Sequence, residues 1–93
     1  MNELDHCETA IHLIVQEYGR ATNKNGPFHS AHEGYAVILE ELDELKAEIW
    51  KNEQNRDYDK MMREAVQVAA MGIRFIVDIC LKEIVGQRLE VRE

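Results

Sequence analysis

Long apolar runs and clusters of positive charge are both missing from this 93-residue sequence. No stretch of 18 or more apolar residues occurs, so we expect no transmembrane helix. The first residues lack the basic start and apolar core of a signal peptide, which predicts a cytoplasmic protein. The 11 lysines and arginines are outnumbered by 18 aspartates and glutamates, and the formal net charge is −7. Because nucleic-acid surfaces need clustered Lys and Arg, we expect neither nucleic acid nor a membrane as a partner.

Cysteine is scarce, and a glycine-rich phosphate loop is absent. Cys7 and Cys80 are the only two cysteines, and they form no CxxC pattern. Both fall on apolar faces of expected helices, so we expect two small core residues in a reducing compartment. Without a glycine-rich loop, a P-loop nucleotide site is excluded.

Proline is also rare, and the single Pro27 lies in the strongest helix breaker of the chain, residues 23–27. A second polar stretch, residues 52–57, divides the remainder. Between these breaks apolar residues recur every three or four positions, which predicts helices over residues 3–21, 30–51 and 57–85. At the start of the second helix, Ser30 and Glu33 have the spacing of a capping box.

No useful period-two alternation of apolar residues appears, so no sheet is expected. The chain is therefore predicted to be one all-α domain over residues 1–93, a short bundle of three main helices. The third helix is apolar around most of its circumference and needs cover on several sides. Two other helices in so short a chain supply too little cover. We expect a homo-oligomer, either a dimer or a tetramer, to complete the bundle.

Carboxylates are concentrated between Glu40 and Glu48 in the second predicted helix. At about 100° per residue, Glu41, Glu44 and Glu48 lie along one line that borders the apolar seam. Like charges at this spacing repel one another, and no Lys or Arg lies three or four residues from Glu44. A bound divalent cation would relieve the repulsion.

The third predicted helix carries Glu64 and Gln67 on one face. If the second and third helices are antiparallel, oxygen-bearing side chains from both can converge on Mg²⁺, a hard ion that takes oxygen ligands. The spacing is equally compatible with an ordinary solvated helix face, because glutamate-rich helices are common.

The sequence from His32 to Leu45 resembles the first metal motif of the MazG-like nucleoside triphosphate pyrophosphohydrolases, an all-α superfamily. That motif is a pair of glutamates, two intervening residues and another glutamate, which Glu40, Glu41 and Glu44 match. The second motif, Glu-x-x-Asp, corresponds to Glu64-Ala65-Val66-Gln67. The resemblance extends over roughly residues 31–78 and includes the order of the elements.

The resemblance implies an enzyme that cleaves nucleoside triphosphates between the α- and β-phosphates, releasing a nucleoside monophosphate and pyrophosphate. It implies Mg²⁺ as cofactor, with Mn²⁺ as a substitute, and a dimer or tetramer of helical protomers. The metal ligands carried over are Glu41, Glu44 and Glu64, with Gln67 at the fourth position. Glu41 or Glu44 would act as the catalytic base. The base and sugar of the substrate stay open, and a phosphoribosyl nucleotide is one alternative.

Gln67 departs from this pattern, because the family usually has aspartate there. Three interpretations stay open: Gln67 is a weaker ligand, Glu48 or Asp78 replaces the missing charge, or the site is degenerate. In the last case the protein is a non-catalytic helical oligomer with a binding or regulatory role.

Several further residues are candidates for supporting roles around this site. Glu40, Glu48 and Asp78 are candidates for contacts behind the metal ligands. The candidate phosphate partners are Lys51, Lys60, Arg63 and Arg74, and Trp50 is a candidate for stacking on a base. Surface charge, salt bridges and terminal packing would explain the same residues without a ligand.

Overall fold

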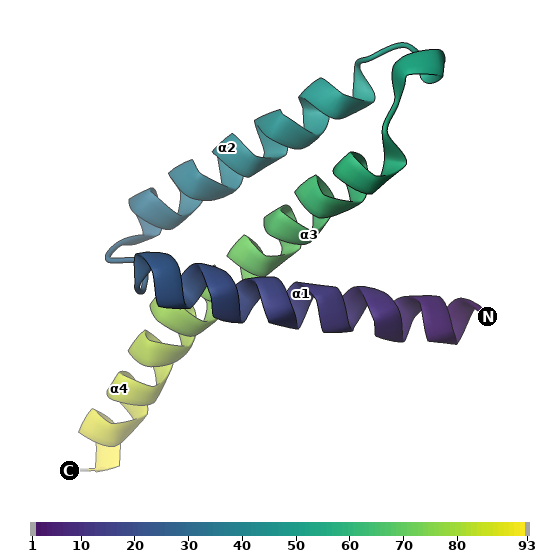
Figure 1. The fold of residues 1–93 in the computed structure, drawn as a ribbon. Helices are drawn as coiled ribbons and strands as arrows, with labels where there is room; N and C mark the ends of the chain where they lie inside the picture. The colour runs from purple at the N-terminus through teal and green to yellow at the C-terminus, as the bar shows by residue number, and fades with distance from the viewer. Residues whose placement is uncertain (1, 93) are drawn as a thin grey trace.

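The computed structural model describes residues 2–92, and these residues are helical along most of their length (Figure 1). The helices are α1 (Glu3–Asn25), α2 (Ala31–Ile49), α3 (Tyr58–Phe75) and α4 (Lys82–Arg92). A π-helical segment, η2 (Ile76–Leu81), joins α3 to α4, and a short 3-10 turn, η1 (Glu53–Asn55), follows α2. No β-strand occurs within residues 2–92, so the all-α prediction is confirmed.

Helix α1 extends four residues further than its predicted end at residue 21. Its start is a capping box that sequence reasoning missed: the Asn2 side chain accepts from the Asp5 N–H, and the Asp5 carboxylate accepts from the Asn2 N–H. Its end is set by Gly26, which has a φ of 70° and donates its N–H to the Thr22 carbonyl. Glycine adopts this left-handed conformation without the steric cost of a Cβ, so the helix stops there and not at the polar residues before it.

Helix α2 begins with only half of the predicted capping box. The Ser30 hydroxyl accepts a hydrogen bond from the Glu33 N–H at 3.1 Å, as expected. The Glu33 carboxylate, however, accepts from the His29 N–H at 3.2 Å, and its other oxygen lies 3.4 Å from His29 Nδ1. The Glu33 carboxylate thus caps the N–H one residue upstream of the N–H that a capping box uses.

Helices α2 and α3 lie side by side as an antiparallel hairpin, and α1 crosses α3 (Figure 1). The fully buried core is small and consists of Ala21, Phe28, Ala70 and Met71. Gly34 on α2 allows a close approach to α3, since a Cβ there would lie 2.6 Å from the Phe75 ring. The two helices that carry the predicted acidic residues are thus in direct contact.

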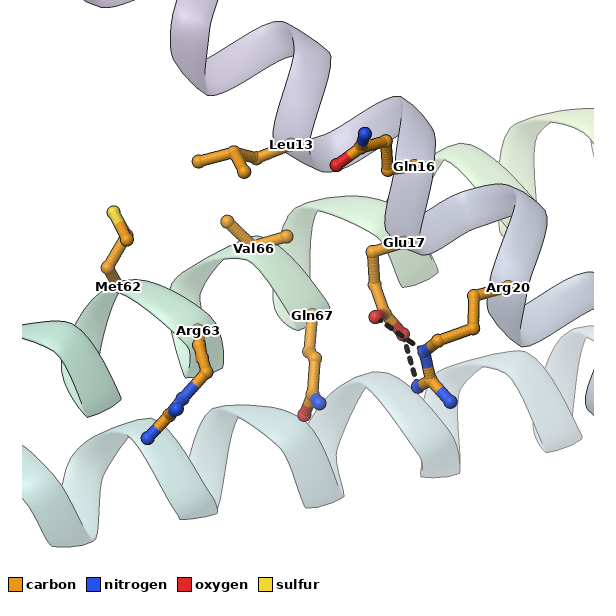
Figure 2. Close-up of a pocket in the computed structure, with 8 residues that line it drawn as sticks. All are labelled: Leu13, Gln16, Glu17, Arg20, Met62, Arg63, Val66 and Gln67. Atoms are coloured by element: carbon orange, nitrogen blue, oxygen red, sulfur yellow. Dashed lines mark hydrogen bonds and ion pairs between the residues drawn. The ribbon is translucent and has the colours of Figure 1, made fainter.

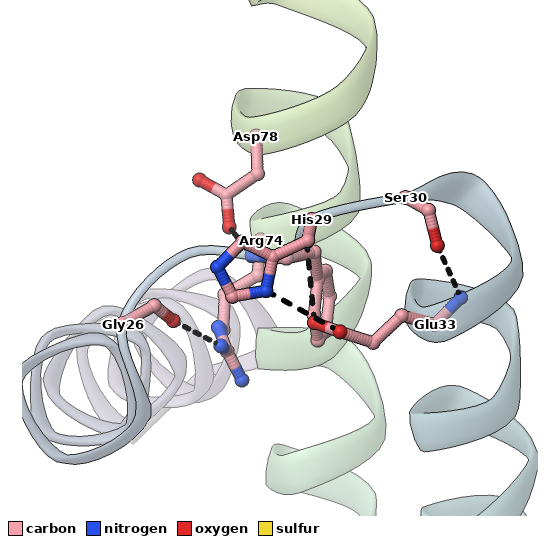
Figure 3. A network of polar contacts seen from close by, with 7 residues as sticks. Gly26, His29, Ser30, Glu33, Arg74 and Asp78 are labelled. Carbon is pink, nitrogen blue, oxygen red and sulfur yellow. Dashed lines mark hydrogen bonds and ion pairs between the residues drawn. The ribbon is translucent and has the colours of Figure 1, made fainter.

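A polar junction fastens the α1–α2 loop to α3 and η2 (Figure 3). Arg74 is only 3% exposed, and its Nη2 donates to the Gly26 carbonyl at 2.6 Å. The Phe28 N–H donates to Asp78 Oδ2 at 2.9 Å. Both side chains therefore bind the backbone of the loop, which fixes where α2 begins relative to α3.

The N-terminal half of α1 extends away from the other helices (Figure 1), and its apolar side chains are exposed. Leu4 is 66% exposed, and Ile11 and Val15 are more than half exposed. The prediction that Cys7 is a core residue is wrong for the single chain, because Cys7 lies on this exposed part of α1. Cys80 is half-buried, and both thiols are free. Among the described residues, no helix combines the length and apolar character needed to cross a membrane.

Candidate metal centre

Three carboxylates from two helices converge at the contact between α2 and α3. Glu41 and Glu44 lie one turn apart on α2, and Glu64 lies on α3. One carboxylate oxygen from each lies within 4.8 Å of the other two, and this is the only such grouping of His, Cys, Asp or Glu among the described side chains. We call it the glutamate triad. The antiparallel contact of the two helices brings together residues that are 20 or more positions apart in the sequence.

The triad holds more negative charge than its surroundings neutralise. Glu41 Oε2 and Glu64 Oε2 are buried and have no hydrogen-bond partner. Burial is the main reason that the pKa of Glu41 is raised to about 7. The charge of Glu44 and a hydrogen bond with Glu44, when the two carboxylates share a proton, raise this pKa further. The charges of Glu64 and Glu40 act in the same direction. Burial also raises the pKa of Glu64, and Glu44 adds to the effect through a hydrogen bond and its charge. A proton or a cation must therefore stabilise the triad.

The donor set fits Mg²⁺. Three carboxylates supply hard oxygen ligands, and Mg²⁺ is usually held by few carboxylates together with waters and substrate phosphates. Mn²⁺ accepts the same ligands. The two buried oxygens without partners are the atoms that such an ion would satisfy.

Glu48, one turn beyond Glu44 on α2, is engaged elsewhere. It is 5% exposed, its Oε1 accepts from Lys51 Nζ at 2.8 Å, and its Oε2 lies 3.2 Å from Lys60 Nζ on α3. A hydrogen bond from Lys51 is the largest cause of a lowered pKa for Glu48, and Lys60 adds to it. Glu48 is therefore an ionised carboxylate between two ammonium groups and lies outside the triad.

A cleft of about 290 Å³ lies between α1 and α3 (Figure 2). Its apolar lining comes from Leu13, Met62 and Val66, and its polar lining comes from Gln16, Glu17, Arg20, Arg63 and Gln67. Gln67 lies one turn after Glu64 on α3, so the cleft begins beside the triad. The position that departs from the Glu-x-x-Asp pattern is thus a lining residue of this cleft.

Arg20 is a functional candidate that sequence reasoning missed. Its Nη2 and Nε donate to the two carboxylate oxygens of Glu17 at 2.6 and 2.9 Å (Figure 2). A hydrogen bond with Glu17 is the main cause of a raised pKa for Arg20, and the charge of Glu41 also contributes. The guanidinium therefore lies within electrostatic reach of the triad. No motif in α1 signals this, because the placement depends on how α1 crosses α3.

The remaining predicted site residues lie apart from the triad. Arg74 and Asp78 belong to the junction with the α1–α2 loop, where both contact the protein itself (Figure 3). Trp50 is 72% exposed at the end of α2, with Lys46 Nζ 5.5 Å from its ring centre. Glu40 precedes Glu41 on α2, and it affects the triad through its charge, which helps to raise the pKa of Glu41.

Comparison of the chain with protein-family models, with curated proteins and with solved structures returned no match.

Proposed function

We propose that this protein is a Mg²⁺-dependent nucleoside triphosphate pyrophosphohydrolase that releases a nucleoside monophosphate and pyrophosphate. The observation that carries the proposal is the glutamate triad, in which Glu41, Glu44 and Glu64 converge from two helices and leave two buried oxygens without partners. The resemblance of the two acidic motifs to those of MazG-like enzymes supports the same reaction.

The triad would hold the metal ion, with the Gln67 carbonyl oxygen as a fourth, uncharged ligand. A bound Mg²⁺ neutralises phosphate oxygens and activates water for attack at phosphorus. Glu41 and Glu64 are partly buried, whereas Glu44 is exposed to solvent. Glu41 would take the proton that leaves the attacking water, since a carboxylate with a raised pKa is a competent base near neutral pH, and Glu44 is the alternative base.

Cations around the triad support a polyphosphate substrate in spite of the net charge of −7. Lys51 and Lys60 pair with Glu48. Arg20 and Arg63 line the cleft. Such an arrangement attracts phosphate groups to an acidic centre that would otherwise repel them.

The cleft supports a nucleotide over a bare polyphosphate. Its volume of about 290 Å³ is close to the lower end of small-ligand pockets, roughly 300 Å³ and above, and suits one base. Leu13, Met62 and Val66 offer an apolar wall to a planar ring, and the amides of Gln16 and Gln67 can donate to and accept from its polar edge.

We further propose that the protein acts in the cytoplasm as a dimer or tetramer. Apolar side chains are exposed on both α1 and α2, including Leu4, Val15, Tyr35 and Leu42. A second copy of the chain would cover them, and burial of exposed apolar area is the main driving force for such association.

The test is an assay of pyrophosphate and monophosphate release from ribo- and deoxyribonucleoside triphosphates and a phosphoribosyl nucleotide, with Mg²⁺ and with chelator. We expect equal amounts of the two products, only with the metal. Glu41→Gln should abolish turnover. Glu83→Gln, which alters an exposed carboxylate on α4, is the matched control and should behave as wild type.

A second candidate function is a non-catalytic helical oligomer with a binding or regulatory role. It is favoured by Gln67, which offers no charge where a fourth carboxylate would complete the acidic set. Absence of turnover across the panel, together with no thermal response of the folded protein to Mg²⁺, would reject the enzyme and support this alternative.

A further inference from the structure

Glu48 joins α2 to α3 through Lys60, and it also pairs with Lys51, which follows α2 directly. Its carboxylate is buried, yet each oxygen contacts an ammonium group, Lys51 Nζ at 2.8 Å and Lys60 Nζ at 3.2 Å. The lysines themselves are only about half-buried, with 42% and 46% of their side chains exposed. A buried carboxylate thus anchors two cations whose remaining N–H groups can face outward.

Lys60 lies one turn before Glu64 on α3, and its partner Glu48 lies one turn after Glu44 on α2. The contact between Lys60 and Glu48 is therefore one helical turn from the glutamate triad on both helices, next to the place where Mg²⁺ and the phosphates would bind. An ammonium has three donors, so pairing with Glu48 leaves others for phosphate oxygens.

We propose that Glu48 is a positioning residue, which holds the ammonium groups of Lys60 and Lys51 beside the glutamate triad so that they bind the phosphate chain of the substrate. This inference rests on the proposed function. It gives Glu48 a task distinct from metal ligation, since both of its oxygens are occupied by lysines.

The physical reason is the flexibility of lysine. Its long side chain samples many rotamers in solvent, and a free lysine must lose this freedom when it binds phosphate. Glu48 is buried and contacts both ammonium groups, so it orders the two lysines before the substrate arrives. Phosphate binding then requires less further ordering of Lys60 and Lys51.

The test compares Glu48→Gln with wild type in two measurements. The first is calorimetric binding of inorganic tripolyphosphate in the presence of Mg²⁺, which reports on the phosphate chain alone. The second is steady-state hydrolysis of the triphosphate that wild type cleaves fastest. We expect Glu48→Gln to raise both the tripolyphosphate Kd and the KM about five- to tenfold, with kcat changed less than about twofold.

Two further variants separate positioning from a general loss of structure. Lys60→Met alters a half-exposed side chain and should raise the Kd by a similar factor. Combining it with Glu48→Gln should cost less binding free energy than the two single changes added together, because Glu48 acts in part through Lys60. Glu83→Gln, an exposed glutamate on α4, should change neither value.

An unchanged or lower Kd in Glu48→Gln would overturn the inference, as would full additivity with Lys60→Met or failure of wild type to bind tripolyphosphate. A fall in kcat with constant KM would also reject it. If wild type binds tripolyphosphate but hydrolyses no triphosphate, the proposed function fails on its own, and the binding constants still decide the role of Glu48.

Discussion

The guanidinium of Arg74 lies over the ring of Phe28, with 4.1 Å between its central carbon and the ring centre. Both residues are buried, one on α3 and the other in the loop before α2. The same guanidinium donates to the Gly26 carbonyl at 2.6 Å and lies 3.2 Å from Met71 Sδ. The sequence makes Arg74 a candidate phosphate partner, and in the structure its contacts lie within the junction between α1, α2 and α3.

Arg74→Met should therefore destabilise the fold. The variant loses a charge-assisted hydrogen bond and a cation–π contact, which together are worth about 2–4 kcal/mol of unfolding free energy. Urea denaturation followed by circular dichroism measures the change, with the exposed Arg88→Met on α4 as control. A loss below about 1 kcal/mol would show that the junction does not depend on Arg74.

The stability of the metal-free protein should fall as the pH rises. The pKa of Glu41 is raised from its ordinary value of 4.5 to about 7 in the folded state, so the folded state binds its proton more tightly than the unfolded state. The loss begins near pH 4.5 and is complete above pH 7. After allowance for solvent screening we expect about 1–2 kcal/mol.

Denaturation in chelator at pH 5, 6, 7 and 8 measures this dependence. Glu41→Gln should flatten the curve, because the amide does not titrate. Saturating Mg²⁺ should raise stability at pH 8 by about 2.7 kcal/mol at one hundred times its Kd. A wild-type curve that is flat in chelator would show that the triad is not strained by its charge.

Gln67→Asp should strengthen metal binding and raise activity. A fourth carboxylate one turn after Glu64 adds a charged oxygen ligand to the triad, and we expect the Mg²⁺ Kd to fall about tenfold. Without metal the same variant should be less stable than wild type at pH 8, because it adds negative charge to an already repulsive cluster. Calorimetric Mg²⁺ titration gives the Kd.

Gln67→Asn is the matched control for this change, since it keeps a neutral amide and should not tighten metal binding. If aspartate weakens binding or leaves it unchanged, Gln67 lies outside the ligand set and belongs only to the cleft.

Val66→Phe should block the nucleoside part of the substrate without affecting the phosphates. Val66 lines the α1–α3 cleft, and a larger ring would occupy part of its volume of about 290 Å³. We expect the KM for nucleoside triphosphates to rise at least about tenfold, because the new ring would fill the space that the base needs. Binding of Mg²⁺ and tripolyphosphate should stay at wild-type values. If the variant lost affinity for tripolyphosphate and for the nucleotide by the same factor, the base would bind elsewhere, and Trp50 would be the next candidate for stacking on it.

The helices could be predicted from the sequence because their signals are local. Apolar residues at three- and four-residue spacing define a helix without reference to the rest of the chain, and Pro27 and the polar residues 52–57 mark the breaks. The row formed by Glu41, Glu44 and Glu48 follows from the same periodicity. The helix ends were less predictable, as Gly26 and the His29–Glu33 contact show.

Which residues meet across helices depends on tertiary packing. The register between α2 and α3 places Glu41 and Glu44 against Glu64 but places Glu48, on the same line of α2, against Lys60. The approach of the α1–α2 loop to η2 gives Asp78 a backbone partner, the Phe28 N–H. The direction of α1 leaves Cys7 exposed. Helical periodicity specifies only the direction of a side chain around its own axis, whereas the crossing and offset of two helices decide what that side chain contacts.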